Sequence, residues 1–261
     1  MTKAEQSAYW RQWNRFQQKY ERIYERKFVK ALQMQVDAFI KYKDINLVPM
    51  FPIYDILVSL YQTVGPQWAR VTRTESVKAT GQMGFNERIV ELMRQYYGVD
   101  LLNDAEKIND YTKEVIGKVL AQAAELGWSF EQIVAELRTN SELSIMRARR
   151  IARTETVTSA NGAAMIYAMT SGNKMEKIWI AVKDQRTRHD HRVADGKRLP
   201  IEEPFTLQSP KYGDITMMQP GVRKQGANSS GDSVPAGEVV NCRCVIAFKA
   251  MRDQDGKLIR A

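Results

Sequence analysis

The sequence predicts an α+β protein, in which a mostly helical N-terminal region precedes a small α+β domain with a short antiparallel sheet and a long irregular loop. Up to about residue 170, apolar residues recur at three- and four-residue steps, as in amphipathic helices. Two short apolar runs then alternate with other residues like strands, at 178–182 and 240–248. Between these runs, residues 197–237 contain five of the eight prolines and five of the fifteen glycines, with little periodicity.

These patterns divide the 261 residues into three parts. Residues 1–48 are predicted to form a long N-terminal docking helix, and residues 49–140 a further helical region. Residues 141–261 form the predicted α+β domain. The hydrophobic content of 44% and the charged content of 26% are those of an ordinary globular protein.

Membrane insertion and secretion are not expected. No apolar run approaches the ~20 residues that span a bilayer, and the polar, aromatic N-terminus does not resemble a signal peptide. Cys242 and Cys244 are separated by one residue, a spacing that disfavours an unstrained disulfide in extended backbone. The sequence therefore predicts a protein made in a cytoplasm, with its cysteines present as reduced thiols or metal ligands.

The net charge of +9 lies mainly in the C-terminal part, where residues 141–261 carry a surplus of seven basic over acidic residues, against two for residues 1–140. Such a surplus favours polyanionic partners, although a well-solvated surface explains it equally well. We expect weak, sequence-independent binding of double-stranded DNA that falls steeply with salt. The candidate DNA-binding residues are Arg186, Arg188, Arg192, Lys197, Arg198, Arg223 and Lys224.

The first predicted helix, residues 4–42, has aromatic residues at three- and four-residue steps with basic residues interleaved between them. Its aromatic face could clamp single-stranded nucleic acid by stacking, or it could pack against a core or a partner helix, which is the commoner use of such a face. No matching helix is evident close by in the sequence, so we expect the helix to dock on another protein. The aromatic face contains Tyr9, Trp13, Phe16, Tyr20, Ile23 and Tyr24, and the basic residues between them are Arg11, Arg15, Lys19, Arg22, Arg26 and Lys30.

Further helices are expected over residues 53–97 and 104–126, with a stop at Gly98. Breaks are possible at Gly65-Pro66 and between residues 81 and 84. Ser129 and Gln132 form the capping-box signature of another short helix.

The last helix expected before the strands, residues 142–170, places Glu155 in a stripe of small residues that lets another element approach closely. A half-buried carboxylate there requires a cationic partner, for which we expect an arginine of the same helix or of the loop 186–192. The competing interpretation is a catalytic carboxylate. The stripe consists of Ala148, Ala152, Glu155, Ser159 and Gly162.

Both histidines and both cysteines lie in the loop after the first strand or in the second strand. Zinc coordinated by His191, Cys242 and Cys244, with His189, Asp190 or Asp184 as the fourth ligand, is one interpretation. The other is buried thiol packing, because a regular strand holds alternate Cα atoms about 7 Å apart. We expect Asp184, His191, Cys242 and Cys244 to converge in either case.

Four short motifs resemble the phage Mu F-like minor head (head morphogenesis) protein family. They are ARTET at 152–156, the loop D-x-R-T-R-x-x-H beginning at Asp184, the pair Asp195-Gly196, and Asn-Cys-Arg-Cys at 241–244. The residues that carry the resemblance are Arg153, Thr154, Glu155, Asp184, Arg186, Arg188, His191, Asp195, Gly196 and Asn241.

The resemblance implies a structural protein without catalysis, found in the host cytoplasm during assembly and then in the head interior of the virion. Its implied partners are the phage portal protein, capsid or scaffolding protein, and packaged DNA, with a role in head morphogenesis and in packaging or ejection. The alternative is a metal-dependent nuclease or other DNA-processing enzyme. A plain DNA-binding module is a third possibility. Some proteins with this domain continue into a toxin such as an ADP-ribosyltransferase, which we do not expect here.

Overall fold

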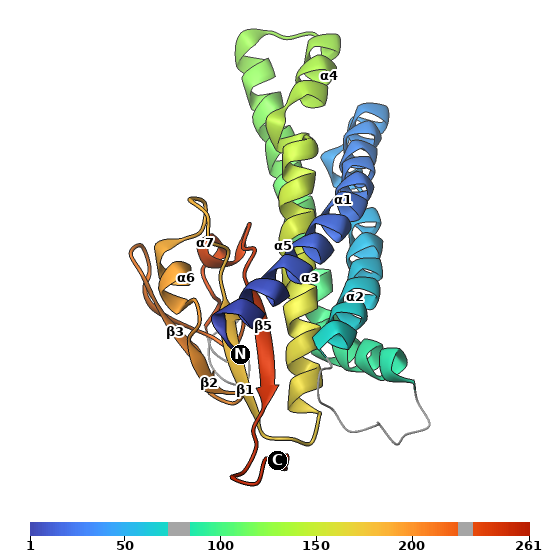
Figure 1. Ribbon diagram of the computed structural model, residues 1–261. Helices are drawn as coiled ribbons and strands as arrows, with labels where there is room; N and C mark the ends of the chain where they lie inside the picture. The colour runs from blue at the N-terminus through green and yellow to red at the C-terminus, as the bar shows by residue number, and fades with distance from the viewer. Residues whose placement is uncertain (73–83, 224–231) are drawn as a thin grey trace.

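The computed structural model describes residues 1–72, 84–223 and 232–261. A group of long helices forms most of the molecule, and two small antiparallel sheets lie along one side of it (Figure 1). This arrangement confirms the predicted fold class. The elements in chain order are α1 Lys3–Tyr42, η1 Ile45–Leu47, α2 Phe51–Thr72, α3 Phe85–Leu126, α4 Phe130–Thr139, η2 Ser141–Leu143, α5 Ile145–Met169, β1 Met175–Ile180, α6 His189–Ala194, β2 Arg198–Pro200, β3 Phe205–Ser209, β4 Gly213–Met217, α7 Ala236–Val239 and β5 Val245–Ala250.

Helix α1 buries its aromatic face inside this chain. Its N-terminus is capped by Thr2, whose hydroxyl accepts a hydrogen bond from the Glu5 backbone N–H. The Trp13 ring lies 4.8 Å from that of Trp68 on α2, and the Trp13 indole donates to the Arg243 carbonyl before β5 (2.9 Å). The inference that this face needs another protein to cover it is therefore wrong, because α2 and the α+β part cover it.

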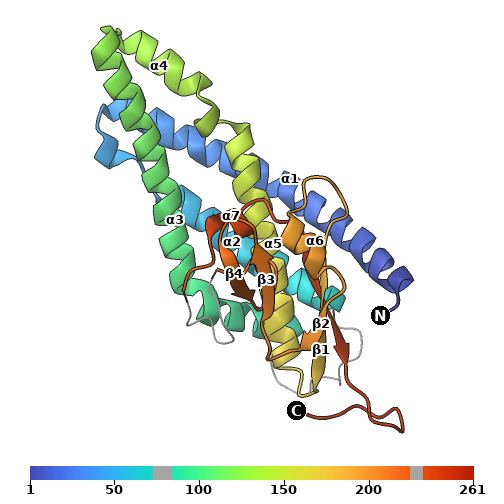
Figure 2. The same ribbon diagram turned by 90° about the vertical axis from the view of Figure 1, so that its left-hand side faces the viewer.

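Helix α5 runs through the centre of the molecule, with α2 on one side and the sheets on the other (Figures 1 and 2). The small residues along α5 make close packing possible. A Cβ placed on Gly65 of α2 would lie 3.0 Å from the Ala163 Cβ and 3.2 Å from the Ser159 hydroxyl, and the Tyr97 ring covers Gly162. The predicted close approach to the small-residue stripe is confirmed.

Two predicted helix boundaries are wrong. Gly65 and Pro66 lie inside α2, where packing of the buried side chains around them compensates for the hydrogen bond that proline removes. Helix α3 continues through Gly98 and includes the helix predicted at 104–126, because buried Met93, Leu101 and Ala105 hold both flanks of that glycine in place. Of the break expected between residues 81 and 84, residues 81–83 lie outside the described ranges.

The C-terminal sheet has the order β2-β1-β5, with antiparallel neighbours. In its register Trp179 faces Ile246 and Ile180 faces Val245. Strand β5 begins only at Val245. The predicted strand placement of Cys242 and Cys244 is wrong, because Asn241 has a φ of 60° and turns the chain just before them.

The loops around the sheet are more ordered than the sequence predicted. Helix α6 lies within the loop 184–196, and the excursion 197–237 contains β2, the β3–β4 hairpin and the first residues of α7. After β5 the chain forms a turn, in which the Asp253 backbone N–H donates to the Lys257 carbonyl (2.9 Å).

One segment of the described residues, Ile45–Thr72, is long and apolar enough to cross a membrane by length and composition. This differs from the expectation that no such segment exists. In the structure α2 contributes buried Ile53, Leu57, Leu60 and Val64 to the main hydrophobic core, which by itself explains an apolar composition.

Candidate functional site

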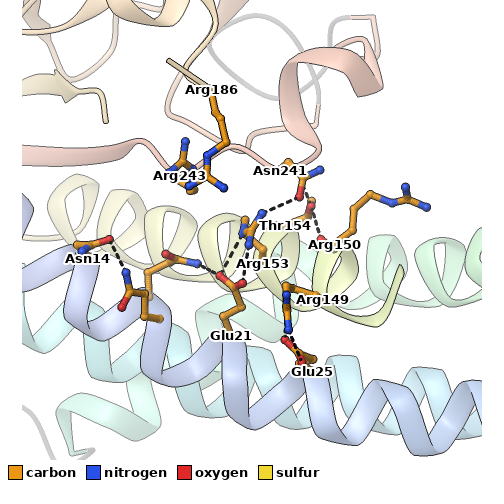
Figure 3. Close-up of polar contacts among 12 residues, drawn as sticks. Asn14, Glu21, Glu25, Arg149, Arg150, Arg153, Thr154, Arg186, Asn241 and Arg243 are labelled. Carbon is orange, nitrogen blue, oxygen red and sulfur yellow. Dashed lines mark hydrogen bonds and ion pairs between the residues drawn. The ribbon is translucent and has the colours of Figure 1, made fainter. Parts of the chain in front are cut away.

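The ARTET segment of α5 meets the Asn-Cys-Arg-Cys segment and α1 at one junction (Figure 3). The Arg153 guanidinium pairs with Glu21 of α1 (2.7 Å) and donates to the Asn241 side-chain oxygen (3.2 Å). The Asn241 backbone N–H donates to the Thr154 hydroxyl (3.1 Å). One turn earlier on α5, Arg149 pairs with Glu25, which lies one turn after Glu21 on α1 (2.7 Å). Through Arg153 and Thr154, α5 therefore binds both the N-terminal helix α1 and the turn before β5.

Asp184 organises the start of the loop after β1. It accepts two hydrogen bonds from Arg243 (2.7 and 2.8 Å), one from the Thr187 hydroxyl and one from the Arg186 backbone N–H, both at 3.1 Å. These donors, Arg243 first, hold the pKa of Asp184 well below its usual range. The Asp184 carboxylate therefore joins the start of this loop to Arg243.

The end of this loop is fixed by Asp195 and Gly196. The Asp195 carboxylate accepts from the Ala181 backbone N–H (2.9 Å). Gly196 has a φ of 80°, which favours glycine, and its N–H donates to the Trp179 carbonyl (2.8 Å). Both residues therefore close the loop onto β1.

His191, Cys242 and Cys244 converge as predicted. The His191 Nδ1 lies 3.6 Å from the Cys242 Sγ and 3.5 Å from the Cys244 Sγ. The His191 Nε2 lies 3.3 Å from the Glu238 Oε2, and the other Glu238 oxygen accepts from the Ser209 hydroxyl (2.8 Å). The expectation that Asp184 joins this cluster is wrong, because its carboxylate binds Arg243 instead.

Charges within the cluster shift the protonation of its members. The hydrogen bond from Cys244, together with His191, lowers the pKa of the Cys242 thiol well below its usual value, whereas the same bond and burial raise that of Cys244. Burial alone would lower the pKa of His191, but Cys242 and Glu238 raise it to about 9. Without a metal, this geometry supports a thiolate–imidazolium pair.

The side chains of His191, Cys242 and Cys244 are at most 2% exposed. Hydrolysis by a Cys-His pair requires substrate access to the sulfur. The burial therefore favours a structural role for the cluster.

Glu155 is paired with an arginine, as predicted, but the partner comes from another segment. Arg223 donates to Glu155 (2.6 Å) and to Asp104 of α3 (3.0 Å), and the Tyr61 hydroxyl of α2 also donates to Glu155 (3.0 Å). The expectation of an arginine from the same helix or from the loop 186–192 is wrong. Burial, opposed by Arg223, raises the pKa of Asp104 to about 7.

The candidate DNA-binding residues do not form one free basic surface. Arg223 binds the two buried carboxylates, and Arg188 donates to the Val240 carbonyl (2.6 Å) and lies 3.6 Å from Glu238. Arg198 pairs with Glu176 (3.3 Å). Lys224 lies outside the described residues. Exposed side chains remain at Arg186, Arg192, Lys197 and Arg198.

Several residues of these sites were not singled out from the sequence. Glu21 and Glu25 interrupt the basic pattern of α1 with a four-residue spacing, which was a usable signal for partners on a facing element. Glu238 and Asp104 gave no comparable signal, because their partners are distant in the chain.

Comparisons with known proteins support the resemblance seen in the motifs. A family model described as "Phage Mu protein F like protein" matches residues 114–247. No solved structure matches the chain.

Two curated relatives share part of the sequence. The minor head protein GP7 of Bacillus phage SPP1 is 31% identical over 135 residues, which is 51% of this chain and 39% of that protein. The NAD(+)–arginine ADP-ribosyltransferase EFV of Enterococcus faecalis (strain ATCC 700802 / V583) is 32% identical over 123 residues, 45% of this chain and 22% of that protein. The matches thus cover less than half of either relative. The family match extends over half of the chain, and the chain therefore belongs to the phage Mu protein F-like family.

Proposed function

We propose that this protein is a structural component of a phage head, associated with the portal in the head interior and acting in head morphogenesis without catalysis. The observation that carries the proposal is the use of the family's motif residues. Arg153 binds Glu21 of α1, the Asn241 backbone N–H binds Thr154 of α5, and Asp184 binds Arg243 before β5. These contacts support a rigid connection between the helices and the sheets.

A nuclease is the competing function, and the burial of the His/Cys cluster argues against it. Metal-assisted hydrolysis requires a phosphodiester to reach the metal ligands. His191 is 1% exposed, so DNA cannot contact it without opening the fold.

Head association is tested by co-expressing the whole chain with the portal and major capsid proteins of the same phage or prophage. We expect the protein to co-purify with the portal and to be found in assembled heads by mass spectrometry. The whole chain is needed because truncating α1 would expose the core that its aromatic face covers. Heads that assemble in normal yield without incorporating the protein would contradict the proposal.

DNA contact is a second element of the proposal, and the outer face of α1 supports it. Arg11, Arg15, Lys19, Arg22, Arg26 and Lys30 are all exposed along this helix. The two acidic residues of residues 6–36, Glu21 and Glu25, are buried against Arg153 and Arg149. Between residues 6 and 36, the face that α1 leaves to a partner therefore carries basic and neutral side chains and no acidic one, and the docking role proposed for residues 1–48 belongs to this face.

Charge reversal distinguishes this face from the C-terminal residues first expected to bind DNA. The α1 variant carries Arg15→Glu, Arg22→Glu and Arg26→Glu, and its matched control carries Arg186→Glu, Arg192→Glu and Lys197→Glu. We expect the α1 variant to bind double-stranded DNA much more weakly. The slope of log K against log salt should become shallower by about 0.9 for each phosphate that the variant no longer neutralises. Fluorescence anisotropy over a salt series measures both quantities. A larger loss of affinity in the control variant would assign binding to the α+β part instead.

A further inference from the structure

We propose that His191, Cys242 and Cys244 bind one zinc ion, which joins α6 to the turn before β5. The three side chains come from two segments separated by the whole excursion 197–237. Their exposed fractions are 1%, 2% and 2%. This inference concerns the isolated protein and does not depend on the proposed role in the head.

The distances between the ligand atoms fit a tetrahedral zinc site. Zinc lies about 2.3 Å from a thiolate sulfur and about 2.0–2.1 Å from an imidazole nitrogen, which sets a sulfur–nitrogen separation of about 3.5–3.6 Å in a tetrahedron. The His191 Nδ1 lies 3.6 Å from the Cys242 Sγ and 3.5 Å from the Cys244 Sγ. No movement of the imidazole away from either sulfur is needed to admit the ion.

The backbone at Cys242 and Cys244 is not a regular strand, so the two thiols can approach one ion. On a regular strand their Cα atoms would be about 7 Å apart, but β5 begins after Cys244. Asn241 turns the chain, and the Cys244 backbone N–H donates to the Cys242 Sγ (3.5 Å). An N–H group directed at sulfur stabilises a thiolate, which is the form that binds zinc.

The far side of the imidazole provides an independent observation. Metal-binding histidines commonly donate their second ring N–H to a carboxylate, which fixes the tautomer and directs the other nitrogen at the metal. The His191 Nε2 lies 3.3 Å from the Glu238 Oε2, and Ser209 holds the other Glu238 oxygen (2.8 Å). With Nε2 beside the carboxylate, Nδ1 is the ring nitrogen that lies beside the two sulfurs.

The fourth position is assigned to water, because the Asp190 carboxylate lies beside His191 and Glu238 and not beside the two sulfurs. Asp190 precedes His191 on α6 and is 3% exposed, and its Oδ2 has no hydrogen-bond partner within the described part of the chain. A buried carboxylate oxygen without a partner is costly unless a cation or proton reaches it. The Asp190→Asn variant should therefore retain the zinc, and loss of the ion in this variant would contradict the assignment of water as the fourth ligand.

The test uses the whole chain, purified without chelator and without a histidine tag, then incubated with zinc and desalted. We expect about one zinc per chain by elemental mass spectrometry. The chelator EDTA should lower the melting temperature by roughly 5–10 °C. The protein reconstituted with cobalt(II) should show a thiolate-to-cobalt charge-transfer band. Absence of zinc, together with a melting temperature that EDTA leaves unchanged, overturns the proposal and leaves the two thiols as packing residues.

Variants locate the site. His191→Ala, Cys242→Ser and Cys244→Ser should each lose the zinc, whereas His189→Ala, at an exposed histidine two residues from His191, should retain it. If the first three variants fold poorly, the cobalt spectrum of the unmodified protein still shows whether thiolates bind the metal. Loss of zinc in the His189→Ala variant would contradict the proposed ligand set.

Discussion

Replacing Lys177 with methionine is expected to stabilise the protein by about 2–3 kcal/mol at pH 6, since it removes a charge buried in β1. Lys177 has 0% exposure, and its Nζ donates to the Met218 carbonyl (3.0 Å) and lies 5.2 Å from the centre of the Phe205 ring. Burial, opposed by Glu202 and Glu203, lowers its pKa to about 7. The Met218 carbonyl loses its donor in the variant, which offsets part of the gain.

The same substitution should change the pH dependence of stability. Between about pH 7 and the ordinary lysine pKa of about 10.4, the unfolded chain binds more protons at Lys177 than the folded chain does. This site therefore makes the wild-type protein more stable as pH rises through that range. The stabilisation by Lys177→Met should accordingly shrink towards pH 10. Urea unfolding from pH 6 to 10 measures this, with Lys249→Met, at an exposed lysine of β5, as the control. Parallel pH profiles for wild type and Lys177→Met would show that the amine is not buried as described.

Glu155→Gln is expected to destabilise the protein by about 3 kcal/mol, because it leaves Arg223 with a single carboxylate in a buried network. Glu155 is 5% exposed and Asp104 6% exposed, and Arg223 binds both. The negative charge of Glu155 is one of the causes that raise the pKa of Asp104. Its removal should therefore favour the ionised form of Asp104, which pairs with Arg223 and so limits the loss of stability.

The matched control is Glu176→Gln, which removes a carboxylate of the same kind from a partly exposed pair with Arg198. Surface pairs contribute about 0–1 kcal/mol, so thermal or chemical unfolding should separate the two variants clearly. A Glu155→Gln protein as stable as the Glu176→Gln protein would mean that Arg223 contributes little to joining α5, α3 and the excursion.

Much of the helical part of the fold could be predicted, because its determinants are local. The periodicity of α1, the capping box at Ser129 and the small-residue stripe of α5 each lie within one or a few turns of sequence. The failed boundaries at Gly65-Pro66 and Gly98 share a cause. In the interior of a helix, glycine and proline are less favourable than alanine by about 1 and 3 kcal/mol. The stabilisation from tertiary packing on both flanks outweighs these costs.

For the candidate site, residue types and order identified which side chains matter but not which of them bind one another. Asp184 was expected to join His191, Cys242 and Cys244, yet its carboxylate binds Arg243. Arg223 was assigned to DNA from its charge alone, whereas its position against two buried carboxylates gives it a structural role.

The sequence by itself determined the family, the α+β class and the convergence of His191 with Cys242 and Cys244, because motif order and helical periodicity are readable along the chain. Only the tertiary structure decided that α1 turns its aromatic face inward and its basic face outward, and that Glu155 pairs with an arginine 68 residues away. The physical reason is that these choices depend on which surfaces exclude water together. That depends on how distant segments pack, which no local pattern records.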